Sequence, residues 1–364
     1  MKIRGRRPVS LRRTGAWLAA ALLAAGCGAP PEDSVIVVPS AGAARETGPM
    51  VQASAFPNDE LSPRVLRRFA PLAVEQRPPS ELTDLGRMLY FDRRLSKTGQ
   101  ISCNSCHPLD RFGATADAVS TGIMGRRGTR NAPSTFNASG QFAQLWDGRA
   151  ATVEQQATMP IRNELEMGMT GLEVVKVLDR LPGYGAAFHR AFPDAAVPVS
   201  FENVGIALGA FERGLVTPSR WDRYLRGDVH ALDAQEKAGA KLFANLGCIV
   251  CHTGPYVGGS MFERLGARVP WPNQSDTGRK RVTGNDADAM MFKVPGLRNV
   301  AKTAPYFHDG SAATLEQAVR MMARYQLGVE LDSGEVAELK AWLGSLTGDI
   351  PAGYVAAPDL PAGA

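Results

Sequence analysis

The chain has 364 residues, enough for two domains, and its hydrophobic fraction of 44% is ordinary for a globular protein. Its formal net charge is +5, but six basic residues and no acidic residue lie in the first 26 positions. Removal of that segment would bring the charge to about −1, which argues against a nucleic-acid partner.

Residues 1–26 predict an export signal. Basic positions precede the apolar run Trp17–Ala25, which is too short to span a bilayer comfortably. The residues before Cys27 are similar to the bacterial lipoprotein box, in which the signal is cut before a cysteine that is then lipidated. Ala24 departs from that box, because leucine is usual there. The alternative is an ordinary cleavage near Gly28 that discards Cys27.

The sequence that follows predicts a periplasmic protein tethered to a membrane by lipidated Cys27. Residues 28–60 are rich in Ala, Pro, Gly and Ser, a composition that forms flexible linkers. We therefore expect residues 27–75 to form a flexible tether.

Helical patterns occur in both halves of the remaining chain. Ser80 is placed as the N-cap of a helix that reaches Leu89, with Glu81 and Asp84 in its first turn. Further helical patterns cover residues 153–157, 172–181, 201–214, 234–246, 314–325 and 333–346. Residues 108–150 and 253–300 lack long periodicity and should form loops. No convincing strand pattern is present, so the expected fold is mostly α and loop-rich.

The pattern Cys-x-x-Cys-His occurs twice, and it is typical of c-type haem attachment. Two thiols add to the porphyrin vinyl groups, and the histidine that follows binds the iron. A lone Cys-x-x-Cys could equally be a zinc or redox pair, but two complete copies favour haem. The residues are Cys103, Cys106 and His107 in the first copy, and Cys248, Cys251 and His252 in the second.

The two copies predict two cytochrome-c-like haem domains. We expect an N-terminal haem domain at 76–226, a C-terminal haem domain at 227–348 and a tail at 349–364. Cys27 is the only cysteine outside the two motifs, so no disulfide framework is possible.

A series of short motifs between about residues 76 and 348 resembles the bacterial dihaem cytochrome c peroxidases and the related dihaem enzymes that mature methylamine dehydrogenase. The motifs include Leu89-Tyr90-Phe91-Asp92, Arg130-Asn131-Ala132-Pro133, Leu145-Trp146-Asp147-Gly148-Arg149, Glu166-Met167-Gly168-Met169, Val294-Pro295-Gly296-Leu297-Arg298-Asn299 and Pro305-Tyr306-Phe307-His308-Asp309-Gly310. They run in the family's order and at close to its spacing.

The resemblance implies a peroxidase with a division of labour. The N-terminal haem would meet hydrogen peroxide, and the C-terminal haem would accept electrons from a small periplasmic cytochrome c or cupredoxin. Glu166 matches the catalytic glutamate, Gln156 its glutamine neighbour, and Trp146 the tryptophan between the haems. A single glutamate is usually a solvated surface charge, but the surrounding Glu-Met-Gly-Met motif favours the catalytic role.

The resemblance also implies further ligands. Met322 matches the axial methionine of the C-terminal haem iron, although Tyr325 would be the rival in the maturation enzymes. Asn131, Thr303 and Pro305 match ligands of a calcium ion between the domains, and their oxygen atoms suit calcium. Asp147 and Arg149 are expected to hold loops or a haem propionate, and His308 to be structural.

One departure from the family concerns the loop before Asn131. Many relatives have a histidine there that closes the N-terminal haem until the other haem is reduced. This chain has Gly122-Ile123-Met124-Gly125 instead. Either Met124 ligates the iron or no side chain does.

Two other functions remain open at this point. The same haems could oxidise a Trp or Tyr of a partner protein, or the chain could be an electron carrier without a substrate. Glu166 and Gln156 argue against a carrier, because a carrier has no use for an acid/base group beside an open iron. The motifs leave both a monomer and a homodimer open.

Overall fold

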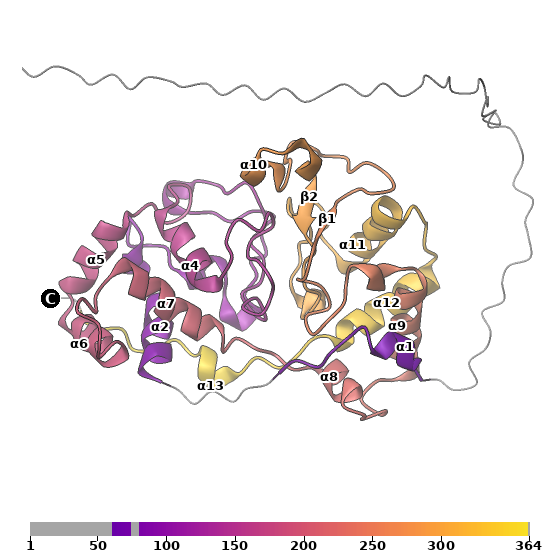
Figure 1. The fold of residues 1–364 in the computed structure, drawn as a ribbon, viewed down its shortest axis with the longest axis horizontal. Helices are drawn as coiled ribbons and strands as arrows, with labels where there is room; N and C mark the ends of the chain where they lie inside the picture. The colour runs from indigo at the N-terminus through magenta and orange to yellow at the C-terminus, as the bar shows by residue number, and fades with distance from the viewer. Residues whose placement is uncertain (1–59, 74–79, 363–364) are drawn as a thin grey trace, which may run out of the picture. The chain divides into compact units, whose positions relative to one another are not determined.

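The computed structural model describes residues 60–73 and 80–362, all within one compact unit, Phe56–Ala364 (Figure 1). The predicted signal, Cys27 and most of the predicted tether lie outside the described residues. The helices are α1 (Pro63–Leu66), α2 (Glu81–Phe91), α3 (Cys103–Cys106), α4 (Val153–Arg162), α5 (Gly171–Asp179), α6 (Pro182–Ala191), α7 (Phe201–Glu212), α8 (Arg220–Leu225), α9 (Ala234–Asn245), α10 (Lys280–Thr283), α11 (Leu315–Met321), α12 (Ser333–Ser345) and α13 (Ala352–Val355). A π-helical segment, η7 (Met322–Leu327), continues α11.

The mostly helical, loop-rich fold class is confirmed. Between α3 and α4 the chain contains only two short 3-10 turns, Leu109–Arg111 and Ile123–Gly125, as the missing periodicity of this stretch predicted. The expectation of no strands was wrong in detail. Strands β1 (Phe262–Arg264) and β2 (Met291–Lys293) pair antiparallel. Three-residue strands are too short to show an alternating pattern, and their pairing depends on contacts distant in sequence.

Two hydrophobic cores organise the described residues. The first lies among α2 and α4–α7 and the second among α8, α9 and α12. Each contains a helix pair that approaches closely at a glycine. A Cβ on Gly86 of α2 would overlap the carbonyl of Ala207 in α7, and one on Gly239 of α9 would overlap that of Glu338 in α12. In both cores, a glycine therefore permits two helices to pack closely.

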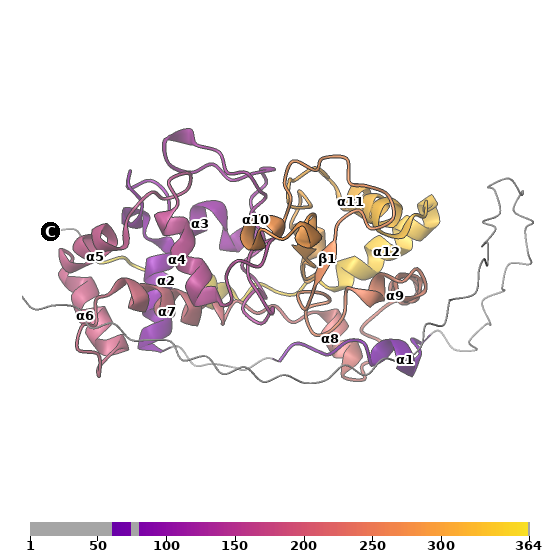
Figure 2. The same ribbon diagram turned by 45° about the horizontal axis from the view of Figure 1, so that its top comes forward.

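The two ends of the described chain each pack on the core of the other half (Figures 1 and 2). Leu61 is buried in the second core. Leu72 is also buried, and its N–H donates to Asp222 of α8 at 2.7 Å. Near the other end, Tyr354 packs on the first core and its hydroxyl donates to the Phe211 carbonyl at 2.7 Å. The tether prediction was therefore wrong for residues 60–73, because isolated leucines in an aperiodic stretch give no sequence signal of packing.

Candidate functional site

The first Cys-x-x-Cys-His motif forms a single helical turn. Ser102 and Ser105 cap α3 reciprocally, so Cys103 and Cys106 begin and end one turn. The next residue, His107, has Nδ1 3.1 Å from the Gly113 carbonyl oxygen. This contact suits a proton on Nδ1 and leaves Nε2 free as a ligand. Burial lowers the pKa of His107 and favours the neutral imidazole that binds metal.

The second motif repeats this arrangement on a 3-10 turn, Cys248–Val250. Nδ1 of His252 lies 3.2 Å from the Val257 carbonyl oxygen, so Nε2 is again free. Burial lowers the pKa of His252 to about 4, which keeps the imidazole neutral at physiological pH. Both motifs thus present two thiols and one neutral imidazole.

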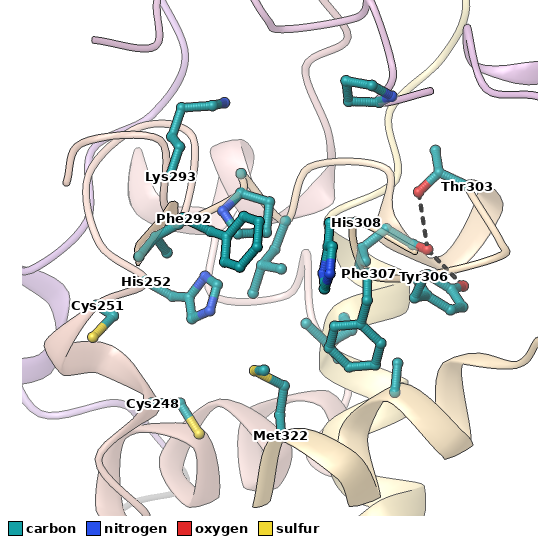
Figure 3. A pocket seen from close by; sticks show the side chains of 18 of the residues that line it. Cys248, Cys251, His252, Phe292, Lys293, Thr303, Tyr306, Phe307, His308 and Met322 are labelled. Atoms are coloured by element: carbon teal, nitrogen blue, oxygen red, sulfur yellow. Dashed lines mark hydrogen bonds between the residues drawn. The ribbon is translucent and has the colours of Figure 1, made fainter. Parts of the chain in front are cut away.

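Each motif borders a cavity. The C-terminal cavity, about 300 Å³, is lined by Cys248, Cys251 and His252, and Figure 3 shows His252 and Met322 directed into it. The N-terminal cavity, about 680 Å³, is lined by Cys103, Cys106 and His107. The thiols, the free imidazole nitrogens and these cavities fit two covalently attached haems.

Met322 lies at the start of the π-helical segment η7, and π-helical turns often occur at functional sites. It lines the C-terminal cavity together with His252. Its rival Tyr325 is not among the residues lining this cavity, and its ring instead packs 5.1 Å from that of Trp271. Met322, and not Tyr325, therefore lines the cavity together with His252.

Glu166 and Gln156, the two predicted acid/base and peroxide-orienting residues, both line the N-terminal cavity. Gln156 lies on α4, and Glu166 lies in the turn that follows this helix. Burial raises the pKa of Glu166, while a hydrogen bond from Asn163 and the charge of Arg149 oppose the rise. A carboxyl group with a raised pKa can exchange protons closer to neutral pH than an ordinary glutamate can.

Asn163 is a positioning residue that the sequence analysis missed. Its Nδ2 donates to Glu166 Oε1 at 2.6 Å, and its Oδ1 accepts from the Leu165 N–H at 3.0 Å. Its backbone carbonyl also accepts from the Glu166 N–H at 3.0 Å. An asparagine three residues before Glu166 is a weak signal alone, because turns often contain asparagine.

In the pH–rate profile of peroxide turnover, the fall in rate on the acidic side should move to higher pH in Asn163→Asp, by about one pH unit or more. The substitution keeps the Leu165 contact, but it replaces a donor to Glu166 with a like charge, which raises the pKa of Glu166. Steady-state pH profiles test this. As a control, the double variant with Glu166→Gln should show no acidic fall in rate that depends on residue 163. If the acidic fall in rate of the single variant stays at the wild-type pH, Asn163 does not position Glu166.

Trp146 lines both cavities. Its Nε1 donates to the Asn131 carbonyl at 2.9 Å, and its ring centroid lies 6.4 Å from that of His308. His308 is 2% exposed, and its Nε2 has no hydrogen-bond partner among the described residues. The position of Trp146 between the cavities is the one expected of a relay residue.

The predicted calcium ligands Asn131, Thr303 and Pro305 all line the C-terminal cavity (Figure 3 shows Thr303). The Asn131 side-chain amide donates to two backbone carbonyls at 3.3 Å, and Oδ1 accepts no hydrogen bond from the described residues. No group of three or more His, Cys, Asp or Glu residues suited to a metal ion occurs in the described ranges. The three candidates are neutral oxygen donors, a set that calcium accepts.

An ion-pair network joins residues from both halves beside the cavities. Arg130 contacts Asp147 at 2.6 Å and Asp276 at 2.6 Å, and Arg149 contacts Asp147 at 2.9 Å. Asp147 and Arg149 therefore hold the loop around Trp146, one of the two roles predicted for them.

The structure does not support Met124 as a distal ligand. Met124 is 71% exposed and is not among the residues that line the N-terminal cavity. Its neighbour Ile123 is buried, and the Ile123 N–H donates to the Glu166 carbonyl at 2.8 Å. Because the backbone is pinned at Ile123 and turns to positive φ at Met124, the methionine faces solvent.

No helix of the described ranges is long and apolar enough to cross a membrane.

The family described as "Di-haem cytochrome c peroxidase" matches residues 80–230. The chain is 45% identical over 274 residues to cytochrome c551 peroxidase of Nitrosomonas europaea, covering 75% of this chain and 81% of that protein. It is 43% identical to cytochrome c551 peroxidase of Pseudomonas aeruginosa, covering 81% and 84%.

A similar fold occurs among solved structures. A MauG-like protein associated with microbial copper homeostasis superposes with a TM-score of 0.68 at 29% sequence identity. The match covers 79% of this chain and 96% of that structure. The similarity therefore extends over both cavities.

Proposed function

Given that the chain belongs to the di-haem cytochrome c peroxidase family, we propose how its residues carry out the reduction of hydrogen peroxide. The enzyme is a cytochrome c peroxidase, so two electrons from the donor and two protons convert one hydrogen peroxide to two water molecules. We assign the peroxide to the N-terminal cavity and the entry of electrons to the C-terminal cavity.

Cys103 and Cys106 would hold one haem by thioether bonds, and Cys248 and Cys251 the other. His107 and His252 would be the proximal ligands. Bound haem supplies the redox chemistry that splits the O–O bond and moves electrons. Within the protein, these residues fix each group in its cavity and exclude bulk water.

Glu166 moves the protons in this proposal. Its carboxylate accepts a proton from one peroxide oxygen and donates it to the other, which leaves as the first water. The two electrons and two further protons then convert the remaining oxygen to the second water. Gln156 orients the peroxide by hydrogen bonds, and Asn163 holds the Glu166 carboxylate in place. Trp146, which lines both cavities, would be the relay for electrons between them.

One observation carries the proposal: Glu166, with its raised pKa, and Gln156 line the same cavity as His107. Mixing the purified protein with hydrogen peroxide and a reduced small cytochrome c or cupredoxin tests it. Rapid oxidation of the donor supports the peroxidase. A long-lived oxidised species with slow donor turnover would favour oxidation of a Trp or Tyr on a partner protein, and no reaction would leave only an electron carrier.

We expect Met322→Leu to remove the thioether-to-iron charge-transfer band of the oxidised protein and to lower the potential of the C-terminal haem. Leucine conserves volume but cannot ligate, and methionine ligation raises haem potentials. The matched control is Met321→Leu, because Met321 packs in aromatic and aliphatic clusters outside the cavity lining. A band that survives Met322→Leu would remove Met322 as the ligand.

Several further features belong to the same proposal. A calcium ion bound by Asn131, Thr303 and Pro305 would stabilise the contact between an N-terminal and a C-terminal haem domain. Lipidation at Cys27 would hold the enzyme on the periplasmic side of a membrane, close to its electron donor. These features rest on motif similarity and on the shared cavity lining of the three residues. Sedimentation of the purified holoenzyme would distinguish a monomer from a homodimer.

A further inference from the structure

Lys293 is a buried cation in the C-terminal cavity that the proposed mechanism does not use. It ends strand β2, is 8% exposed and lines the cavity. Its backbone N–H donates to the Trp146 carbonyl at 2.8 Å, which fixes the strand beside the loop between the cavities. Lysine is almost never fully buried unless it is paired, because its ammonium group loses hydration.

The side chain of Lys293 has a neutral partner only. Its Nζ donates to Oε1 of Gln141, and no carboxylate of the described residues lies within ion-pair distance. Other buried cations of this protein differ. The Arg298 guanidinium contacts Asp222 at 2.7 Å, and Arg130 contacts two aspartates. The protein therefore supplies anions for these guanidinium groups but none for the Lys293 ammonium.

Desolvation lowers the pKa of Lys293 to about 8, so most of the population is protonated at pH 7. A charged group in a largely apolar cavity is stabilised by a counter-charge. Because no carboxylate of the described residues lies beside Lys293, the group that occupies the cavity is the candidate source of this counter-charge.

The position of Lys293 indicates that counter-charge. In Figure 3, Cys248 and Cys251 lie beside and below His252, whereas Lys293 lies above it, beyond Phe292. A c-type haem is attached by its vinyl groups, and its two propionate carboxylates project from the opposite edge of the ring. A haem attached at Cys248 and Cys251 would direct its anionic edge away from these thiols, and Lys293 is a buried cation of the remaining lining.

We propose that Lys293, held by Gln141, binds a propionate of the haem attached at Cys248 and Cys251. This inference rests on the proposed function in one respect, the assignment of a haem to this cavity. The consequence is electrostatic. A cation beside the propionate favours the more negative, reduced state of the haem, so Lys293 raises its reduction potential.

The test compares holoenzyme variants by redox titration of each haem. Lys293→Gln should lower the potential of the C-terminal haem by an amount equal to about a tenfold change in its reduction equilibrium, or about 59 mV. Lys293→Arg should retain most of the wild-type potential, because it keeps the charge. Lys302→Gln removes a charge from an exposed lysine nearby in sequence, and should leave both potentials unchanged.

Resonance Raman spectroscopy provides a direct readout of the contact. The propionate bending band of the C-terminal haem should shift in Lys293→Gln and remain in place in Lys302→Gln. An unchanged potential and an unchanged band in Lys293→Gln, with both haems attached, would overturn the proposal.

A second variant serves if Lys293→Gln fails to fold. Gln141→Glu places a competing carboxylate beside Lys293 and should lower the same potential, whereas an unchanged potential would again overturn the proposal. A separate outcome applies to the proposed function. If a haemochrome assay finds fewer than two covalent haems in the wild-type protein, the haem assignment fails before the role of Lys293 is tested.

Discussion

Glu166→Gln should lower peroxide turnover by about 10²–10⁴-fold while both haems remain attached. The amide fills the same space and can still accept the hydrogen bond from Asn163, but it cannot exchange a proton. Wild-type turnover should fall as the pH drops through the raised pKa of Glu166, because protonation removes the base. The variant should lack this dependence.

The matched control is Glu164→Gln. Glu164 is exposed and lies two residues away in the same turn, so this variant makes the same chemical change outside the cavity. We expect its turnover to stay near the wild-type value. If Glu166→Gln also stays within a few-fold of wild type, Glu166 is not the acid/base group.

The fully oxidised protein should react with hydrogen peroxide without prior reduction. His107 is the sole histidine among the described residues that line the N-terminal cavity, so no second imidazole closes the site. Met124 faces solvent. Met159 lines the cavity, but a thioether is a soft ligand that binds ferric iron weakly and should yield to water or peroxide.

Resting-state electron paramagnetic resonance and rapid mixing with peroxide measure this. We expect a high-spin ferric component from the N-terminal haem and an immediate spectral change on mixing. Two low-spin ferric signals, together with no reaction until the protein is half reduced, would contradict the prediction. In that case Met159→Leu would show whether this methionine closes the site.

The sequence predicted features that depend on local chemistry. The Ser80 hydroxyl accepts from the Thr83 N–H at 3.2 Å and caps α2 as expected, and both Cys-x-x-Cys-His motifs border cavities. Local rules also produced an error. A helical pattern was expected over residues 153–157 only, yet α4 continues to Arg162 with Pro160 inside it. Proline usually ends a helix, but surrounding packing overrode that tendency here.

The remaining features depend on contacts distant in sequence. Lys293 matters because its side chain is enclosed by a cavity built from both halves, and nothing in a Met-Phe-Lys stretch predicts that enclosure. Met124 was a reasonable ligand by position, but the backbone bond between Ile123 and Glu166 turns it away. Neither burial nor the direction of a side chain in an irregular loop can be read from periodicity.

Because each end of the described chain packs on the core of the other half, the two halves should not fold well when the chain is cut between them. A cut between residues 226 and 227 would divide the second core: Leu61 would stay on the first fragment, whereas Phe243 and Trp342, which belong to the same core, would be on the second. The second fragment would carry Tyr354 away from α7. Each single-haem fragment would expose apolar side chains that are buried in the whole chain, and each would carry a segment that packs on the other fragment. Coexpressed fragments should therefore associate with each other, whereas either fragment alone should aggregate or be degraded.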